Sequence, residues 1–113
     1  GKPGSGERAI GQLRRLSGQR VTFYTAVHVV RTDSRANEGH LDVTTVHFRP
    51  LSDEEIERYV ARDKPFHCAG GFRVESLGIA LFTRIESQDP TALIGLPLIW
   101  LAGALRRHGF LVP

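Results

Sequence analysis

The stretch CAGGFRVES, residues 68–76, combines residue types that could bind a ligand: a thiol, two adjacent glycines and a carboxylate. Gly70 and Gly71 allow a tight turn, and they also allow the backbone to approach a ligand closely, because both roles need the absence of a Cβ. Glu75, just ahead of the apolar alternation in 77–81, is either a solvated loop residue or a side chain that reaches into a pocket. The sequence therefore supports two interpretations of this loop, a structural turn and the floor of a ligand site.

Metal binding and nucleophilic catalysis have little support in the spacing of histidine and cysteine. The five histidines share no metal-ligand spacing such as H-x-x-x-H, and Cys68 has no C-x-x-C partner. His67 and Cys68 are adjacent, but neighbours in an extended chain point to opposite sides, which disfavours a hydrogen-bonded nucleophile and base. We therefore interpret Cys68 as a small buried residue. Lys2, taken alone, is a residue near a frayed terminus.

The periodicity of apolar residues in the first half of the chain predicts a helix and two strands. Residues 6–17 have helical spacing, which stops at Gly18. Residues 19–31 alternate with period two and are apolar on both sides, which predicts a strand with both faces covered. A polar loop over 32–40 separates this strand from a second one over 41–49, so we expect an antiparallel hairpin.

The second half predicts two helices with a strand between them. Ser52 and Glu55 form a capping-box pattern at the start of a helix that must end before Pro65. Its expected buried residues are Ile56, Tyr59 and Val60. Residues 77–86 predict a third strand, and Pro97 suits the first turn of a final helix. Together the elements indicate an α/β fold with a mixed, partly antiparallel sheet flanked by helices.

The composition is that of an ordinary globular domain, with 41% hydrophobic and 24% charged residues. The longest apolar stretch is shorter than the roughly 20 residues that a bilayer span needs, so we expect no membrane segment. A single cysteine cannot form an internal disulfide and no signal-peptide pattern is present, which favours the cytoplasm. The net charge of +3 permits an anionic partner. The sequence has no basic stripe interleaved with aromatic residues, so a nucleic acid has little support as that partner.

Four longer motifs give the chain a specific resemblance. In order they read GKPGSGERAIGQLRRLSGQRVTFYT, VHFRPLSDEEIERYV, HCAGGFRVESLGIALFTRIESQDP and ALIGLPLIWLAGALRRHG. In this order and spacing, the chain resembles the C-terminal part of the Maf family of nucleoside triphosphate pyrophosphatases. The resemblance implies a Maf/ITPase-like architecture in which residues 1–113 are the C-terminal portion of one domain. CAG at Cys68 and the acidic Glu75 resemble the subgroup that hydrolyses 7-methyl-GTP, whereas pyrimidine-nucleotide members usually read DKAG and carry glutamine.

The resemblance also implies a reaction and a set of substrate-binding residues. A divalent cation, Mg²⁺ or Mn²⁺, and a carboxylate would activate water to attack the α-phosphorus, which releases a nucleoside monophosphate and pyrophosphate. Lys2, in the GKP motif, would help to neutralise the triphosphate. Cys68, Ala69 and Gly70 would line the loop beneath the nucleotide, and Glu75 would contact the base.

Two features of the family would lie upstream of Gly1. They are an S-x-R phosphate-binding segment and a strand whose aspartate is the catalytic carboxylate. We therefore expect the N-terminal half of the domain to be missing, no catalytic residue within this chain, and almost no activity from the chain alone. The absence of any methionine agrees with this expectation. Ser76 stands where the subgroup commonly has glycine, a departure that bears on the placement of Glu75.

A second function class stays open, a non-catalytic nucleotide- or RNA-binding fragment that keeps base recognition and has lost the reaction. Members of the family commonly form homodimers, so a homodimer is the oligomer that the resemblance implies. A sheet without its N-terminal strands would expose an unpaired edge and the Val21–Val29 face. This exposure predicts aggregation or association with a second copy.

Overall fold

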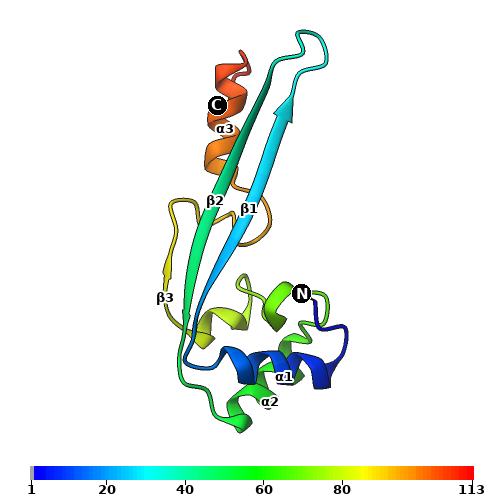
Figure 1. The fold of residues 1–113 in the computed structure, drawn as a ribbon, viewed down its shortest axis with the longest axis vertical. Helices are drawn as coiled ribbons and strands as arrows, with labels where there is room; N and C mark the ends of the chain where they lie inside the picture. Colours follow the sequence, from blue (N-terminus) through cyan, green and yellow to red (C-terminus); the bar gives the residue numbers. More distant parts are fainter. Residues whose placement is uncertain (1) are drawn as a thin grey trace. The chain divides into compact units, whose positions relative to one another are not determined.

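The computed structural model describes residues 2–113, and for Ala69 the backbone alone. One helix precedes the hairpin of the first two strands, and two further helices and a third strand follow it (Figure 1). The chain divides into two compact units. The first consists of Gly1–Val21 and Thr45–Ile85, and the second consists of Thr22–Thr44 and Glu86–Pro113. Among the described helices, none is long and apolar enough to cross a bilayer.

The strands form one three-stranded sheet in the order β1-β2-β3. In chain order the elements are α1 (Gly6–Leu16), β1 (Arg20–Val30), β2 (Asn37–Phe48), α2 (Asp53–Asp63), the 3₁₀ turns η1 (Ala69–Gly71) and η2 (Leu77–Leu81), β3 (Phe82–Glu86) and α3 (Leu98–Arg107). The Arg31 N–H donates to the Ala36 carbonyl, and the Phe48 N–H donates to the Gln19 carbonyl. These two bonds place β1 and β2 in one continuous antiparallel register, which confirms the predicted hairpin.

Helix α1 begins and ends where the sequence predicts. The Ser5 hydroxyl accepts a hydrogen bond from the Arg8 N–H at 3.4 Å, which satisfies one of the free donors of the first turn. Gly18 follows the helix with a φ of +68°, a left-handed conformation that ends a helix at low cost in glycine. Ala9 and Leu13 are completely buried on the inner face of the helix.

Helix α2 has the predicted capping box. The Ser52 hydroxyl accepts from the Glu55 N–H at 3.1 Å, and the Glu55 carboxylate accepts from the Ser52 N–H at 3.0 Å. The helix ends at Asp63, because Lys64 adopts a left-handed φ of +47° and Pro65 follows it. Both ends of α2 are therefore fixed by local sequence, and the predicted buried residues Ile56, Tyr59 and Val60 are confirmed.

Three phenylalanines lie at the centre of the first unit. Phe48 of β2, Phe72 and Phe82 of β3 pack edge to face in all three pairs, with ring centroids between 5.1 and 5.5 Å apart. Edge-to-face packing is the arrangement that the quadrupoles of aromatic rings favour. Phe72 directly follows η1, so this core fixes the start of the segment that contains Glu75.

The predicted third strand over residues 77–86 is wrong in its first half. A 3₁₀ turn, η2, occupies these positions, and β3 begins only at Phe82. Leu77 and Ile79 are 45% and 54% exposed, so Leu81 alone of the apolar alternation is buried. A period-two pattern over five residues does not separate a strand from a short turn. Ser76 and Leu77 donate hydrogen bonds to Asp63 of α2. These bonds hold the backbone in a turn, so the chain is not extended at the start of the predicted strand.

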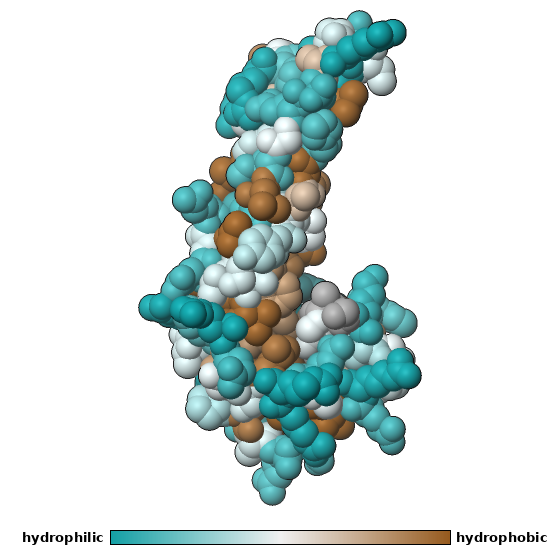
Figure 2. Space-filling model, in the orientation of Figure 1, coloured by the Kyte–Doolittle hydropathy of each residue, from teal (hydrophilic) through white to brown (hydrophobic). Residues whose placement is uncertain are grey.

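The prediction that β1 is covered on both faces is also wrong for the described chain. In the second unit, α3 and the loop before it cover one face, where His40 stacks on Trp100 at 5.1 Å and the Thr25 hydroxyl donates to the Ala92 carbonyl (Figure 1). The Val21–Val29 face, which was expected to be exposed, is this half-buried face. Apolar side chains reach the surface along the hairpin (Figure 2). Those exposed on the opposite face are Tyr24, Val30, Leu41 and Val43.

Helix α3 is capped by a loop rather than by its N-cap residue. Pro97 provides no capping side chain, so the Leu98 N–H donates to the Thr91 hydroxyl at 2.8 Å and the Ile99 N–H donates to the Asp89 carboxylate at 2.8 Å. Burial alone would raise the pKa of Asp89, but hydrogen bonds from Thr91 and the first turn of α3 outweigh burial and lower that pKa below its usual 3.8.

We expect Asp89→Ala to lower the free energy of unfolding by about 1 kcal/mol at pH 7, the typical cost of a lost helix cap. Because the folded pKa lies below 3.8, the Asp89 carboxylate stabilises the fold above that pH and loses this effect as pH falls through the folded value. Urea unfolding at pH 7 and near pH 3 should therefore give a difference between wild type and variant that shrinks in acid. Glu57→Ala, which removes an exposed carboxylate of α2, is the control. Equal stabilities at pH 7 would contradict this role.

Candidate functional site

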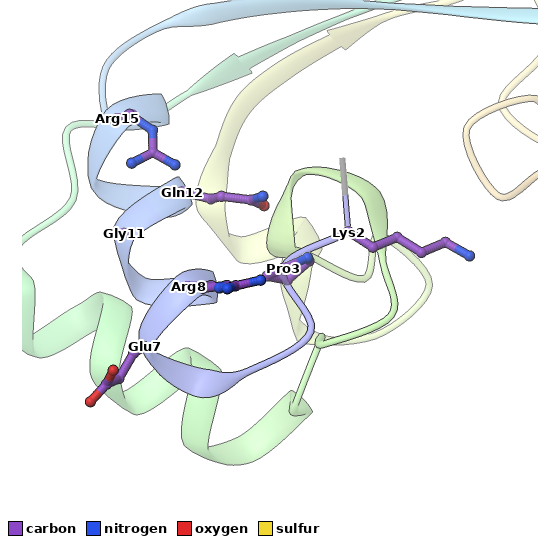
Figure 3. Close-up of a pocket in the computed structure, with 7 residues that line it drawn as sticks. All are labelled: Lys2, Pro3, Glu7, Arg8, Gly11, Gln12 and Arg15. Carbon is purple, nitrogen blue, oxygen red and sulfur yellow. The ribbon is translucent and has the colours of Figure 1, made fainter.

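A cavity of about 400 Å³ opens beside α1, next to Lys2 (Figure 3). Its lining residues are Lys2, Pro3, Glu7, Arg8, Gly11, Gln12 and Arg15. Arg8, Gln12 and Arg15 follow one another at helical spacing, so they lie along one side of α1. The cavity has three cationic side chains and one carboxylate in its lining, a balance that favours an anionic ligand.

The segment that contains Lys2 and the loop that contains Cys68 are joined by their backbones. The Gly4 N–H donates to the Phe66 carbonyl at 2.7 Å. Gly71, with a φ of +78°, lies so close to α1 that an added Cβ would sit 3.3 Å from the Gln12 side-chain oxygen. Glycine is therefore favoured here by its left-handed backbone.

Gly70 and Ala69, the other residues predicted to line the loop, give less evidence about a ligand. Gly70 adopts a left-handed φ of +80° within η1, which supports the interpretation of the two glycines as a tight turn. The side chain of Ala69 lies outside the described part of the chain. Close approach of this backbone to a ligand stays a prediction.

Cys68 is half-buried among charged side chains. Burial raises the pKa of its thiol above the usual 9.0. Arg73 and Lys2 lower this pKa and Glu75 and Asp63 raise it, so all four residues lie near enough to act on the sulfur. A raised thiol pKa leaves little thiolate at neutral pH, which supports an inert cysteine over a nucleophile.

Alkylation of Cys68 should be slower in the folded chain than in the chain unfolded by urea. The reason is that the thiolate is the reactive species and burial disfavours it. Because the chain has one cysteine, the rate of mass increase with iodoacetamide at constant pH reports this site alone. A folded chain that reacts as fast as the unfolded chain would contradict the assignment.

Glu75 lies in the middle of the turn formed by residues 73–77. Its carboxylate is 3.5 Å from the Arg73 guanidinium, and both side chains are 44% exposed. An exposed pair at this distance is weak, so it leaves the carboxylate accessible to a competing donor. Lys2 and Glu75, two of the residues that the sequence predicted for the site, both act electrostatically on a third, Cys68.

Divalent-cation binding does not fit the residues described here. Across residues 2–113, no group of three or more His, Cys, Asp or Glu side chains could hold a metal ion. The cation expected from the family resemblance would need ligands beyond these side chains, so we derive no catalytic step through it.

Tyr59, Asp63 and Arg73 also belong to this neighbourhood, and the sequence did not identify them. Asp63 raises the pKa of the Cys68 thiol and accepts a hydrogen bond from Ser76, which follows Glu75. Cys68 in turn raises the pKa of Tyr59. Their spacing of four residues, which puts two polar groups on the buried face of α2, is the signal that could have found them. Arg73 has no distinguishing pattern.

Comparison with known proteins defines the class to which this fold and site belong. Residues 1–108 match the family model described as Maf-like protein, so the chain belongs to the Maf-like family and the predicted resemblance is confirmed.

Three similar curated proteins share the name 7-methyl-GTP pyrophosphatase. The chain is 52% identical over 113 residues to the 7-methyl-GTP pyrophosphatase of Xanthomonas campestris pv. campestris, and this match covers 100% of the chain and 58% of the relative. It is 48% identical over 112 residues to the 7-methyl-GTP pyrophosphatase of Hahella chejuensis, covering 99% and 56%. It is 49% identical over 109 residues to that of Vibrio cholerae, covering 96% and 56%. The chain thus spans a little over half the length of these curated relatives.

Proposed function

We propose that this chain is the C-terminal portion of a nucleoside triphosphate pyrophosphatase that hydrolyses 7-methyl-GTP, or a related modified nucleotide, to the monophosphate and pyrophosphate. Membership of the Maf-like family and the names of the relatives support this function. The observation that carries it is the backbone hydrogen bond from Gly4 to Phe66, which brings the Lys2 segment to the loop that contains Cys68 although the two are far apart in sequence. The match covers 58% of the Xanthomonas relative, as expected of a chain that is part of a longer protein.

The cationic residues of the site suit a triphosphate. Lys2 is exposed. Its ammonium group is a compact cation on a flexible side chain, so it can adjust its position to the phosphate groups. Arg8 and Arg15 line the cavity beside it and add two further positive charges (Figure 3). Their guanidinium groups can each donate two hydrogen bonds to phosphate oxygens, so this side of α1 would hold the anionic end of the nucleotide.

Glu75 suits the edge of a purine base. A carboxylate only accepts hydrogen bonds, and guanine presents N1–H and N2–H₂ as adjacent donors, so the contact can be bidentate. A methyl group on N7 makes the base cationic, which adds attraction to the carboxylate. The Cys68 loop would lie beneath the nucleotide, and Arg73 would release Glu75 as the base binds.

The reaction needs groups that this chain does not supply. Water attacks the α-phosphorus, the bond to the bridging oxygen of the β-phosphate breaks, and pyrophosphate leaves. A carboxylate from the preceding segment would take the proton of the water. The residues of this chain bind and orient the nucleotide for that attack.

The isolated chain of 113 residues should show almost no hydrolysis of 7-methyl-GTP. Water activation and charge stabilisation at the α-phosphate each contribute orders of magnitude, and the proposal places both in the preceding segment. Pyrophosphate release is measured for the isolated chain and for the full-length protein at equal concentration. Metal-dependent turnover by the isolated chain would contradict the proposal, and a full-length protein that binds without hydrolysis would favour the non-catalytic alternative.

Glu75→Gln in the full-length protein should lower kcat/KM for 7-methyl-GTP by roughly 10- to 100-fold, the range of one charge-assisted hydrogen-bond pair. Glutamine would face one of the two guanine donors with a donor of its own. Activity toward UTP should fall much less, because the smaller pyrimidine does not place two donors there. Glu57→Gln, an exposed change of the same chemistry on α2, is the control. An unchanged preference for 7-methyl-GTP over UTP would remove Glu75 from base recognition.

A further inference from the structure

We propose that Tyr59 and Asp63, two buried residues one turn apart on α2, are positioning residues that hold Glu75 in place for recognition of the base. The proposal rests on the proposed function for the role of Glu75. It adds the origin of that role, a pair of contacts that tie both ends of the turn over residues 73–77 to one helix.

Tyr59 holds the beginning of the turn. The Arg73 N–H donates to the Tyr59 hydroxyl oxygen at 2.6 Å, and Tyr59 is only 6% exposed. Burial raises the pKa of the Tyr59 phenol, so the hydroxyl keeps its proton. Since α2 is capped at both ends, Tyr59 connects Arg73 to a fixed support.

Asp63 holds the end of the turn. Its Oδ1 accepts from the Ser76 hydroxyl at 2.9 Å, and its Oδ2 accepts from the Leu77 N–H at 3.0 Å. Asp63 is 9% exposed, and burial of a carboxylate is unfavourable unless its oxygens are hydrogen-bonded. Both oxygens therefore have a structural reason to face this turn.

The turn is also closed on itself. The Ser76 and Gly78 N–H groups both donate to the Arg73 carbonyl, at 3.2 and 3.0 Å. An added Cβ on Gly78 would lie 2.3 Å from that carbonyl oxygen, so only glycine fits there. With both ends tied to α2 and the backbone closed between them, Glu75 projects from a turn with little freedom.

The contacts act on the turn more than on the helix that supplies them. Helix α2 has its own capping box and buries Ile56 and Val60. Loss of the hydrogen bonds at Asp63 should therefore leave α2 folded and release the turn. In a released turn, Glu75 would occupy many positions. Only a fraction of the molecules would then have Glu75 placed to bind the guanine edge.

The first test measures the clamp directly, on the chain of 113 residues. Alanine at position 63 has no acceptor oxygen, so Asp63→Ala should lose both contacts. Amide hydrogen exchange followed by NMR should then be roughly 10-fold faster at Leu77, the ratio expected for one lost hydrogen bond, with the α2 amides unchanged. Asp53→Ala, an exposed change on the same helix, is the matched control.

The second test measures specificity in the full-length enzyme. We expect Asp63→Ala, and the milder Ser76→Ala if the first variant does not fold, to lower the ratio of kcat/KM for 7-methyl-GTP over UTP by roughly 10-fold. A merely structural role would lower activity toward both nucleotides alike and leave the ratio unchanged. Tyr59→Phe should act in the same direction, with the exposed Tyr24→Phe as its control.

The outcomes separate this proposal from the one on which it rests. Unchanged exchange at Leu77 overturns the clamp. Faster exchange with an unchanged ratio, in a protein where Glu75→Gln does change the ratio, overturns the positioning role alone. If Glu75→Gln leaves the ratio unchanged, recognition of the base by Glu75 fails and the positioning role fails with it, whatever the exchange rates show. Faster exchange together with a lower ratio supports the proposal.

Discussion

The Asp63 carboxylate is the interaction on which the candidate site depends most. It lies at the last turn of α2 and accepts hydrogen bonds from Ser76 and Leu77, so it fixes where the chain turns before η2. The capping box at the other end of α2 makes the helix a firm support for this contact. The phenylalanine core fixes the beginning of the same segment through Phe72. A loop held at so many points can present a carboxylate at a defined position while that carboxylate itself stays exposed.

Charge around the candidate site is distributed in two parts. The cavity beside α1 is mainly cationic, with Lys2, Arg8 and Arg15 in its lining. The turn carries one accessible carboxylate, Glu75, in a weak pair with Arg73. A ligand that is anionic at one end and cationic at the other complements both parts. 7-Methyl-GTP has this pattern, because its triphosphate is negative and its methylated base is positive.

Local sequence signals predicted the helices well, and non-local contacts account for the errors. The Ser52 capping box and the spacing in α1 are encoded within a few residues, so the helices were found with accurate ends. η2 was missed because its backbone depends on Asp63, a residue of another element. The exposed face of β1 was missed because apolar alternation does not reveal whether a second layer is present. Motifs predicted the types of the site residues, while the homodimer and the preceding segment stay predictions.

Chemical-shift mapping of the full-length protein with a non-hydrolysable analogue of 7-methyl-GTP tests the central claim most directly. The claim is that the Lys2 segment, the Cys68 loop and the Glu75 turn surround one nucleotide. It predicts that the backbone amides of Lys2, Gly70 and Glu75 shift together and saturate at the same ligand concentration. Shifts confined to the second unit, for example around Trp100, with these three amides unchanged would contradict it.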